Sequence, residues 1–205
     1  MSPAFIHYRL DELDLRESYR LLTTIVVPRP IAWVSTLSTS GVPNLAPFSY
    51  FSALAADPML IGVSIGERST GDPKDSLKNI RDTGVFCVNV VTTAQLDVMN
   101  ATAASLPPEK SEFDDAQVDL AWTEVTRVPF VEACPVVLEC TLNREIDLAP
   151  ARSALVIGEV HTVRVRDDVL SDDPFSVDVT RLEPVGRLGG KQYAMPGPIR
   201  ELPRP

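Results

Sequence analysis

The stretch NLAPFSYF, residues 44–51, decides how the first half of this 205-residue chain folds. Its aromatic residues are typical of a β-strand, but Pro47 stands in the middle and has no backbone N–H for a sheet ladder. A proline inside a strand is tolerated only at a sheet edge or at a bulge. The sequence leaves three interpretations open: an edge, a bulge at the rim of a barrel, or a ligand site that includes Asn44 and Ser49.

The segments on either side of the proline predict an antiparallel β-protein. IAWVSTLS (31–38) and VPNLAPFSYF (42–51) are separated by a short loop with Gly41, which indicates a hairpin. Further strands are expected at 58–65, 85–91, 136–146 and 153–167, the last with a bend at Gly158. Many short strands at hairpin spacing favour a sandwich or a barrel.

Two helices have clear sequence signals. Residues 14–24 have helical character, and GDPKDSLKNIRDTG (71–84) carries the signals of a second helix. In the second, Asp72 is expected to cap the N-terminus and Pro73 to take the first helical position. Gly84 suits the position just after the helix ends.

A third helix is expected over residues 93–106. Leu96, Met99 and Ala103 occur at helical spacing, so we interpret them as core positions. The next segment, PPEKSEFDDAQVD (107–119), is rich in proline and acidic residues. We expect it to form a surface loop that could act as a lid.

The net charge of −9 argues against general binding to nucleic acid or to anionic lipid, because a basic surface would be needed. No apolar run reaches the roughly 18 residues of a membrane span. The first residues, MSPAFIHYRLDELDLRESY, lack a basic start followed by an apolar block, so no secretion signal is expected. The expectation is a cytoplasmic protein with no membrane partner.

The cysteine and histidine content argues against a metal site or a disulfide framework. Cys87, Cys134 and Cys140 form no C-x-x-C pair, and His7 and His161 are the only histidines. The cysteines are expected to be small buried apolar residues. His161 is expected to be a surface strand residue, with a catalytic role as the alternative.

The second helix offers a candidate anion site. Its N-terminus presents free N–H groups and a partial positive charge, and Arg68, Lys74 and Ser76 lie beside it. This arrangement could hold a phosphate group. The alternative is that the Asp75 carboxylate alone interacts with the helix dipole, while the Lys74 ammonium group is solvated by water.

Two further stretches could contact a ligand. Trp33 could stack on a ring or fill the core. In GRLGGKQY (186–193), Arg187 and Tyr193 could reach a ligand or a partner chain, or the segment could be a surface turn. The spacing of a dinucleotide-binding motif is absent, and no catalytic triad, Walker loop or pair of catalytic carboxylates stands out. The sequence therefore identifies no catalytic residues.

Four motifs in order resemble the flavin reductase-like family, whose members have an FMN-binding split barrel. They are VPRPIAWVST, GVPNLAPFSYF, KDSLKNI and GRLGGKQY, and the resemblance extends over roughly residues 15–195. It implies a mainly β fold: an antiparallel split β-barrel of Greek-key type with peripheral helices. It also implies one domain over residues 1–205, with an N-terminal helix and an extended C-terminal tail, in a homodimer that binds FMN near the subunit interface.

The resemblance also implies the cofactor-binding residues. Those bordering the isoalloxazine and the ribityl chain would be Asn44, Ala46, Pro47 and Ser49, with Ser35 and Thr36 across the hairpin. Those holding the phosphate would be Arg68, Lys74 and Ser76, supported by Asp75 and Asn79. Trp33 and Arg187 complete the expected set, which includes no metal ligand. Position 76 is often threonine in the family, and the serine here keeps the hydroxyl group.

The implied activity is NAD(P)H-dependent reduction of flavin, with NADH or NADPH as co-substrate and a monooxygenase or another redox protein as partner. One alternative is an FMN-holding electron-transfer protein that docks on a redox partner. Another is a barrel that has lost its cofactor and acts through its dimer surface. Hydride transfer to a flavin depends on stacking geometry, so the lack of a catalytic triad is consistent with this chemistry.

Overall fold

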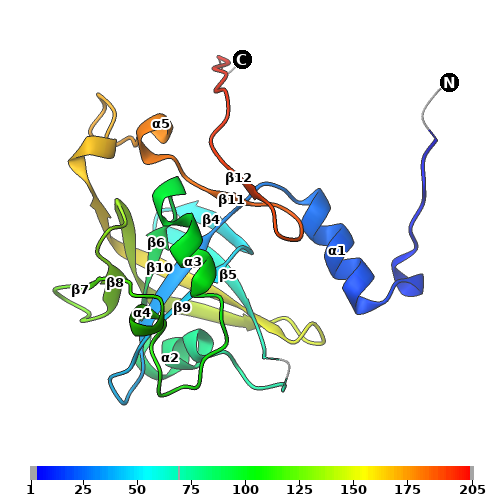
Figure 1. Cartoon of the computed structure of the whole chain (residues 1–205), viewed down its shortest axis with the longest axis horizontal. Coiled ribbons are helices and arrows are strands. Elements are labelled where there is room, and N and C mark those ends of the chain that lie inside the picture. The colour runs from blue at the N-terminus through cyan, green and yellow to red at the C-terminus, as the bar shows by residue number, and fades with distance from the viewer. Residues whose placement is uncertain (1–3, 69, 204–205) are drawn as a thin grey trace.

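The computed structural model describes residues 4–68 and 70–203. Its centre is a seven-stranded antiparallel sheet in the order β3-β2-β6-β9-β10-β5-β4, curved into a barrel (Figure 1). These strands are β2 Ala32–Leu37, β3 Pro43–Phe48, β4 Phe51–Ala56, β5 Met59–Gly66, β6 Val85–Val90, β9 Val136–Asp147 and β10 Ser153–Val165. Because β3 and β4 remain separate edges, the barrel is split, and the predicted fold class is confirmed.

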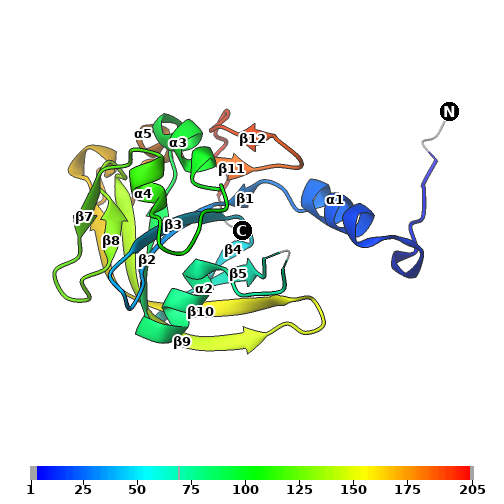
Figure 2. The ribbon, with the colours of Figure 1, turned by 60° about the horizontal axis from the view of Figure 1, so that its bottom comes forward.

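Two small sheets flank the barrel. One has the order β1-β11-β12 and the other pairs β7 with β8. Their strands are β1 Arg29–Pro30, β11 Gly186–Arg187, β12 Tyr193–Ala194, β7 Leu120–Trp122 and β8 Pro129–Val131. The first sheet brings the C-terminal GRLGGKQY segment to the start of β2, so residues far apart in sequence lie side by side (Figure 2).

Short helices cover parts of the barrel, and one stands away from it. The α-helices are α1 Leu15–Ile25, α2 Asp75–Thr83, α3 Leu96–Ala101, α4 Glu112–Asp115 and α5 Val179–Leu182, and the 3-10 helices are η1 Leu10–Glu12, η2 Thr93–Gln95 and η3 Asp167–Val169. α1 is capped by Asp14, whose side chain accepts a hydrogen bond from the Glu17 N–H in a capping box. The predicted first helix is confirmed, and it projects from the body (Figures 1 and 2). Within the described residues, no helix combines the length and the apolar character needed to cross a membrane.

The β2–β3 hairpin answers the question raised by Pro47. β3 is an edge strand, and its Leu45 N–H points away from β2, because it donates to a Glu112 carboxylate oxygen at 3.0 Å. Alternate residues of a strand face alternate sides, so the nitrogen of Pro47 also lies on the open edge. The proline therefore removes no bond from the β2–β3 ladder, and the edge interpretation is confirmed.

The predicted strand 42–51 is wrong at its end. β3 stops at Phe48, and β4 starts at Phe51 on the opposite edge of the sheet. The chain crosses between the two edges at Ser49 and Tyr50, where the Tyr50 carbonyl accepts a hydrogen bond from the Ser64 N–H at 2.8 Å. The aromatic residues of the stretch therefore belong to two strands that pair with different neighbours.

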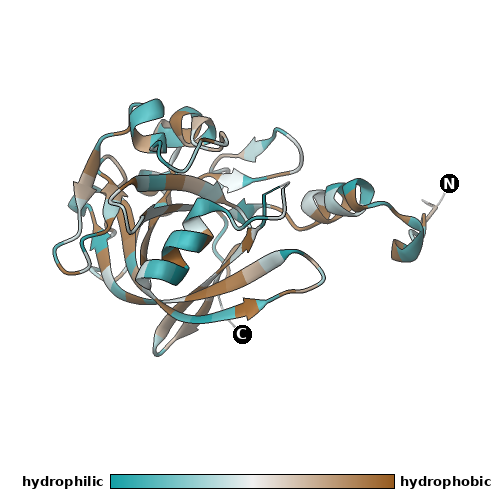
Figure 3. Cartoon of the chain, turned by 90° about the horizontal axis from the view of Figure 1, so that it is seen from below, coloured by the Kyte–Doolittle hydropathy of each residue, from teal (hydrophilic) through white to brown (hydrophobic). Residues whose placement is uncertain are grey.

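Two apolar cores lie on opposite faces of the sheet, as strand alternation requires. In β2, Ala32 and Val34 belong to the core inside the barrel, whereas Trp33 belongs to the core beneath α3, α4 and the β7–β8 hairpin. Apolar residues line the strands of the body in Figure 3. All three cysteines are buried and free, as predicted. Burial raises the pKa of each thiol, those of Cys134 and Cys140 to about 12.

The bend predicted in the long β10 strand is confirmed. Its pairing with β9 shifts register between Ile157 and Gly158. A Cβ atom at Gly158 would lie 2.5 Å from Cζ of Phe86 in the barrel core. Glycine is required here because the strand passes directly over an aromatic ring.

Three helix-related predictions are corrected. α2 begins after Lys74 rather than after Asp72, because Pro73 is held in a bridge with Glu67. The third helix ends at Ala101, which leaves Ala103 exposed, although Met99 is buried as predicted. The expected surface loop 107–119 contains α4, whose Glu112 and Phe113 are buried.

Candidate functional site

The candidate site is built around the turn between β5 and α2. The Arg68 N–H donates to the Asp72 carbonyl at 2.8 Å, and the Gly71 N–H donates to the Arg68 carbonyl at 2.9 Å. Gly71 has φ +92°, a value that favours glycine, and this reverses the chain tightly. The turn places Lys74 at the N-cap and brings Arg68 back beside the first turn of α2.

The N-terminus of α2 is free to receive an anion. Within the described part of the chain, Lys74 makes no side-chain capping bond, and the first-turn N–H groups of the helix have no intrahelical partner. Arg68 forms an ion pair with Asp75, the first residue of the helix. Lys74 has no ion-pair partner among the described residues. Two cations and a helix N-terminus thus lie together here with the Asp75 carboxylate, and the buried Glu112 carboxylate also interacts with Arg68.

Electrostatics at Lys74 favour a negatively charged ligand. The surrounding protein partly desolvates its ammonium group, and together with the nearby Arg68 charge this lowers the pKa of Lys74. The ammonium lies over the ring of Phe48, 5.2 Å from the ring centroid. A phosphate group bound here would relieve the repulsion between the two cations.

Four predicted residues hold α2 against the β2–β3 hairpin. The Asn44 amide donates to the Ser76 hydroxyl at 2.9 Å, and the Asn79 amide donates to the Thr36 hydroxyl at 3.0 Å. All four side chains are buried. The structure brings them together as a support for the helix, and their side chains already have protein partners.

Two other predicted residues lie in the interior. Trp33 is 0% exposed, and its indole N–H donates to the Thr102 hydroxyl at 2.9 Å. Ser35 is also fully buried and accepts a hydrogen bond from the Asn89 amide at 3.0 Å. Of the two roles considered for Trp33, this environment matches the core residue. Both residues stay in the proposed set only as supports for the strand beneath the site.

The edge of β3 supplies the more accessible predicted residues. Ala46, Pro47 and Ser49 are half-buried. The Ser49 hydroxyl is 3.4 Å from Nε of Arg29, a buried residue whose guanidinium also donates to the Thr23 and Val26 carbonyls at 2.7 Å. Arg29 therefore ties the end of α1 to this segment.

Sequence reasoning missed both Arg29 and Phe48 as parts of this region. Strand alternation from Ala46 could have indicated Phe48. The burial of Arg29 has no local signal, because its partners come from α1 and from Leu188.

Arg187 lies elsewhere in the chain. It belongs to the small β1-β11-β12 sheet, which Figures 1 and 2 both show apart from α2. Its guanidinium lies 4.4 Å from the centroid of the Tyr193 ring and donates to the Gly190 carbonyl. The structure does not bring it together with Lys74 within one chain.

The surface next to α2 combines a helix N-terminus, two cations and an open strand edge. The free helix N-terminus with Arg68 and Lys74 matches a phosphate. The β3 edge and β4 offer small and apolar side chains, which suit the face of a flat ring. β4 is exposed along nearly all of its length.

Comparisons with known proteins identify the family. Residues 24–180 match the Flavin reductase like domain, so the chain belongs to the flavin reductase-like family. The chain is 40% identical over 200 residues to an uncharacterized protein of Halalkalibacterium halodurans, which covers 95% of this chain and 94% of the relative.

Two solved structures show how closely the fold is shared. Nitrilotriacetate monooxygenase component B from Bacillus cereus has a TM-score of 0.92 and 33% identity, covering 98% of this chain and 100% of that chain. The 2-nitrobenzoate 2-nitroreductase of Pseudomonas fluorescens has a TM-score of 0.89 and 30% identity, covering 98% and 96%. Both share the split barrel together with its flanking segments.

Proposed function

We propose that the protein binds FMN and catalyses the NAD(P)H-dependent reduction of flavin. The observation that carries this proposal is the free N-terminus of α2, with Lys74 and Arg68 beside it and the open β3 edge close by. Membership of the flavin reductase-like family supports the same conclusion.

Each part of the site has a distinct task in this proposal. Lys74, Arg68 and the first N–H groups of α2 hold the phosphate. Asp75 orients Arg68, while Asn44, Ser76, Asn79 and Thr36 keep α2 in place. Ala46, Pro47 and Ser49 border the ring. Bound flavin would supply the hydride-accepting chemistry, and the chain supplies binding and orientation.

We further propose that the protein is a homodimer. The apolar residues of α1 recur at helical spacing and remain exposed, with Leu15 at 87% and Ile25 at 66%. Leu54 of β4 is also half exposed. Such a helix, projecting from a monomer, buries little of its own apolar surface. A second subunit would cover it, and Arg187 could then contribute to the site of the partner.

A redox protein is the proposed recipient of the electrons. The name of one structural relative, a monooxygenase component B, supports a monooxygenase in this role. The proposal assigns no preference between NADH and NADPH.

Purified protein tests the proposal directly. We expect flavin binding by fluorescence titration, tighter for FMN than for riboflavin, and oxidation of NADH or NADPH when FMN is added. Both nucleotides should be assayed with FMN, FAD and riboflavin. Retained FMN without nicotinamide oxidation would identify an electron carrier instead, and no flavin binding would refute the proposal.

A further inference from the structure

A cavity lies away from α2, and the proposed flavin chemistry does not use it. Its volume is about 410 Å³, and it lies between the β7–β8 hairpin and the outer face of β9 and β10. Figures 1 and 2 show that hairpin at the end of the molecule opposite α1. The volume falls within the range of small-molecule sites, roughly 300–1,000 Å³. The side chains important here are Trp122, Glu124, Phe130, Val137, Glu139 and Arg164.

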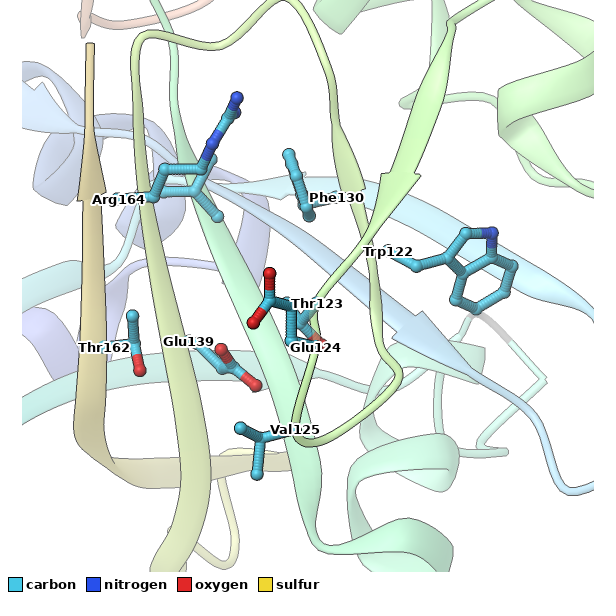
Figure 4. A pocket seen from close by; sticks show the side chains of 9 residues that line it. Trp122, Thr123, Glu124, Val125, Phe130, Glu139, Thr162 and Arg164 are labelled. Carbon is cyan, nitrogen blue, oxygen red and sulfur yellow. The ribbon is translucent and has the colours of Figure 1, made fainter. Parts of the chain in front are cut away.

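Glu139 is an unusual residue in this cavity. It is only 8% exposed, yet no cation lies within ion-pair distance of it in the described parts of the chain. One oxygen, Oε1, accepts hydrogen bonds from the Thr126 N–H and hydroxyl, whereas Oε2 has no bond to a described residue. No fully buried side-chain oxygen of the described residues lacks a hydrogen bond, so Oε2 is accessible at the cavity and can accept a bond from a ligand. Figure 4 shows this carboxylate among the side chains that line the cavity, which include Glu124.

The remaining wall is apolar with one cation at its rim. Phe130 and Val137 are buried and contribute apolar surface. The Arg164 guanidinium lies 4.9 Å from the Phe130 ring centroid and forms no ion pair with any described residue. In Figure 4 it points away from the two carboxylates. The cavity lining thus combines two carboxylates, one cation at the rim and an apolar surface.

We propose that this cavity binds a free amino acid with an apolar side chain. Its ammonium group would pair with Oε2 of Glu139, with Glu124 adding negative potential. Its carboxylate would pair with Arg164, and its side chain would pack on Phe130 and Val137. A simple carboxylate would face two glutamates, and a simple amine would leave Arg164 unused, so a zwitterion matches the charges best. The inference is independent of the proposed flavin reduction.

Three probes distinguish the contribution of the ligand ammonium group from that of the ligand carboxylate. L-phenylalanine carries both charges, phenethylamine lacks the carboxylate, and 3-phenylpropionate lacks the amine. Isothermal titration of the purified protein should show the tightest binding for L-phenylalanine. Charged hydrogen bonds of this kind typically change affinity by about tenfold or more.

Matched variants assign the charges to residues. Glu139→Gln keeps the shape and the oxygen that accepts from Thr126, and should weaken L-phenylalanine and phenethylamine but not 3-phenylpropionate. Arg164→Gln should weaken L-phenylalanine and 3-phenylpropionate but not phenethylamine. Glu132→Gln, at an exposed position just after β8, is the control and should change none of the three.

Thermal unfolding and FMN titration accompany each variant. We expect the FMN affinity to stay unchanged, because the cavity is separate from α2. The proposal is overturned if L-phenylalanine produces no binding heat at millimolar concentration, or if Glu139→Gln binds all three probes like the parent. It is also overturned if Arg164→Gln weakens phenethylamine as much as 3-phenylpropionate, because Arg164 would then not be the partner of the ligand carboxylate.

Discussion

The Lys74 ammonium lies 5.2 Å from the centroid of the Phe48 ring, which joins the N-cap of α2 to the last residue of β3. A cation over an aromatic face is held there by the ring quadrupole. The contact therefore orients the one cation of the site that has no carboxylate partner among the described residues. It places that charge between the helix terminus and the strand edge proposed to face the flavin.

Replacing Lys74 should weaken the binding of FMN more than the binding of riboflavin. We expect Lys74→Ala to weaken FMN binding about ten- to a hundredfold, because a charge-assisted bond to the phosphate is lost. Riboflavin has no phosphate, so its affinity should change much less. Fluorescence titration of both flavins measures the ratio. Lys78→Ala is the control, because Lys78 lies on the same helix and pairs with Asp82. Equal losses for FMN and riboflavin would place the phosphate elsewhere.

The pH dependence of FMN binding should reveal the lowered pKa of Lys74. Desolvation and then the Arg68 charge lower this pKa from its usual 10.5, so the ammonium loses its proton at a less alkaline pH in the free protein. A bound phosphate favours the charged form, and FMN affinity should therefore fall as the pH rises through the lowered pKa. Riboflavin has the same ring as FMN, so the pH dependence of riboflavin binding controls for ionisation of that ring. Arginine stays charged over this pH range, so in Lys74→Arg the affinities for FMN and riboflavin should depend on pH in the same way. If the two affinities already depend on pH in the same way in the parent protein, the prediction is wrong.

The exposed apolar side chains of α1 predict a dimer interface. Charged residues introduced into this interface should disrupt the dimer. We expect Leu22→Asp combined with Ile25→Asp to shift the protein from dimer to monomer in light scattering, because two charges would enter an apolar interface. Both residues are exposed in the single chain, so the fold itself should change little. Arg16→Glu on the same helix is the charge-changing control. A monomeric parent protein would refute the dimer.

Local signals predicted the parts of the fold that depend on neighbouring residues. Gly41 takes φ +84° in the hairpin loop, and Gly84 ends α2 with φ +73°, as the sequence indicated. The start of α2 was misplaced because Pro73 is engaged by Glu67 of the preceding turn. Sequence signals for a cap do not reveal that a tertiary contact already uses the same residues.

The candidate site was predictable in part, because some of its residues are close together in sequence. Lys74 and Arg68 are close in sequence to the helix start, and the structure brings them together. Trp33 and Glu112 depend on partners far along the chain, Thr102 and Leu45, 69 and 67 residues away. No local pattern distinguishes a strand tryptophan in the core from one that stacks on a ligand.

Glu112 should make stability depend on pH in an identifiable direction. Burial raises the pKa of its carboxyl group above 4.5, although the bond from the Leu45 N–H opposes this. A raised pKa means that the folded state holds the proton more tightly than the unfolded state. The contribution of Glu112 is therefore fully present below pH 4.5 and is lost as the pH rises through the raised value.

Two substitutions at Glu112 test this sign. Glu112→Gln keeps an acceptor for the Leu45 N–H, so at pH 7 it should be at least as stable as the parent. Its advantage should shrink as the pH is lowered toward 4.5. Glu112→Ala leaves that N–H without its partner and should lose about 1–3 kcal/mol. Urea unfolding at several pH values measures both. A glutamine variant less stable at pH 7 than at pH 5, relative to the parent, would reverse the assignment.

Gly158 provides a test of the bend in β10. Gly158→Ala would place a methyl group 2.5 Å from Cζ of Phe86, a ring that is only 1% exposed and has little room to move. We expect a loss of about 1–3 kcal/mol in the free energy of unfolding, as for other overpacked cores. Gly66→Ala in β5 is the matched control, because its Cβ would meet nothing within 4 Å. Phe86→Leu combined with Gly158→Ala should recover part of the loss, because the smaller side chain vacates the space. Equal stability of Gly158→Ala and Gly66→Ala in urea unfolding would show that the strand bends for a reason other than the ring.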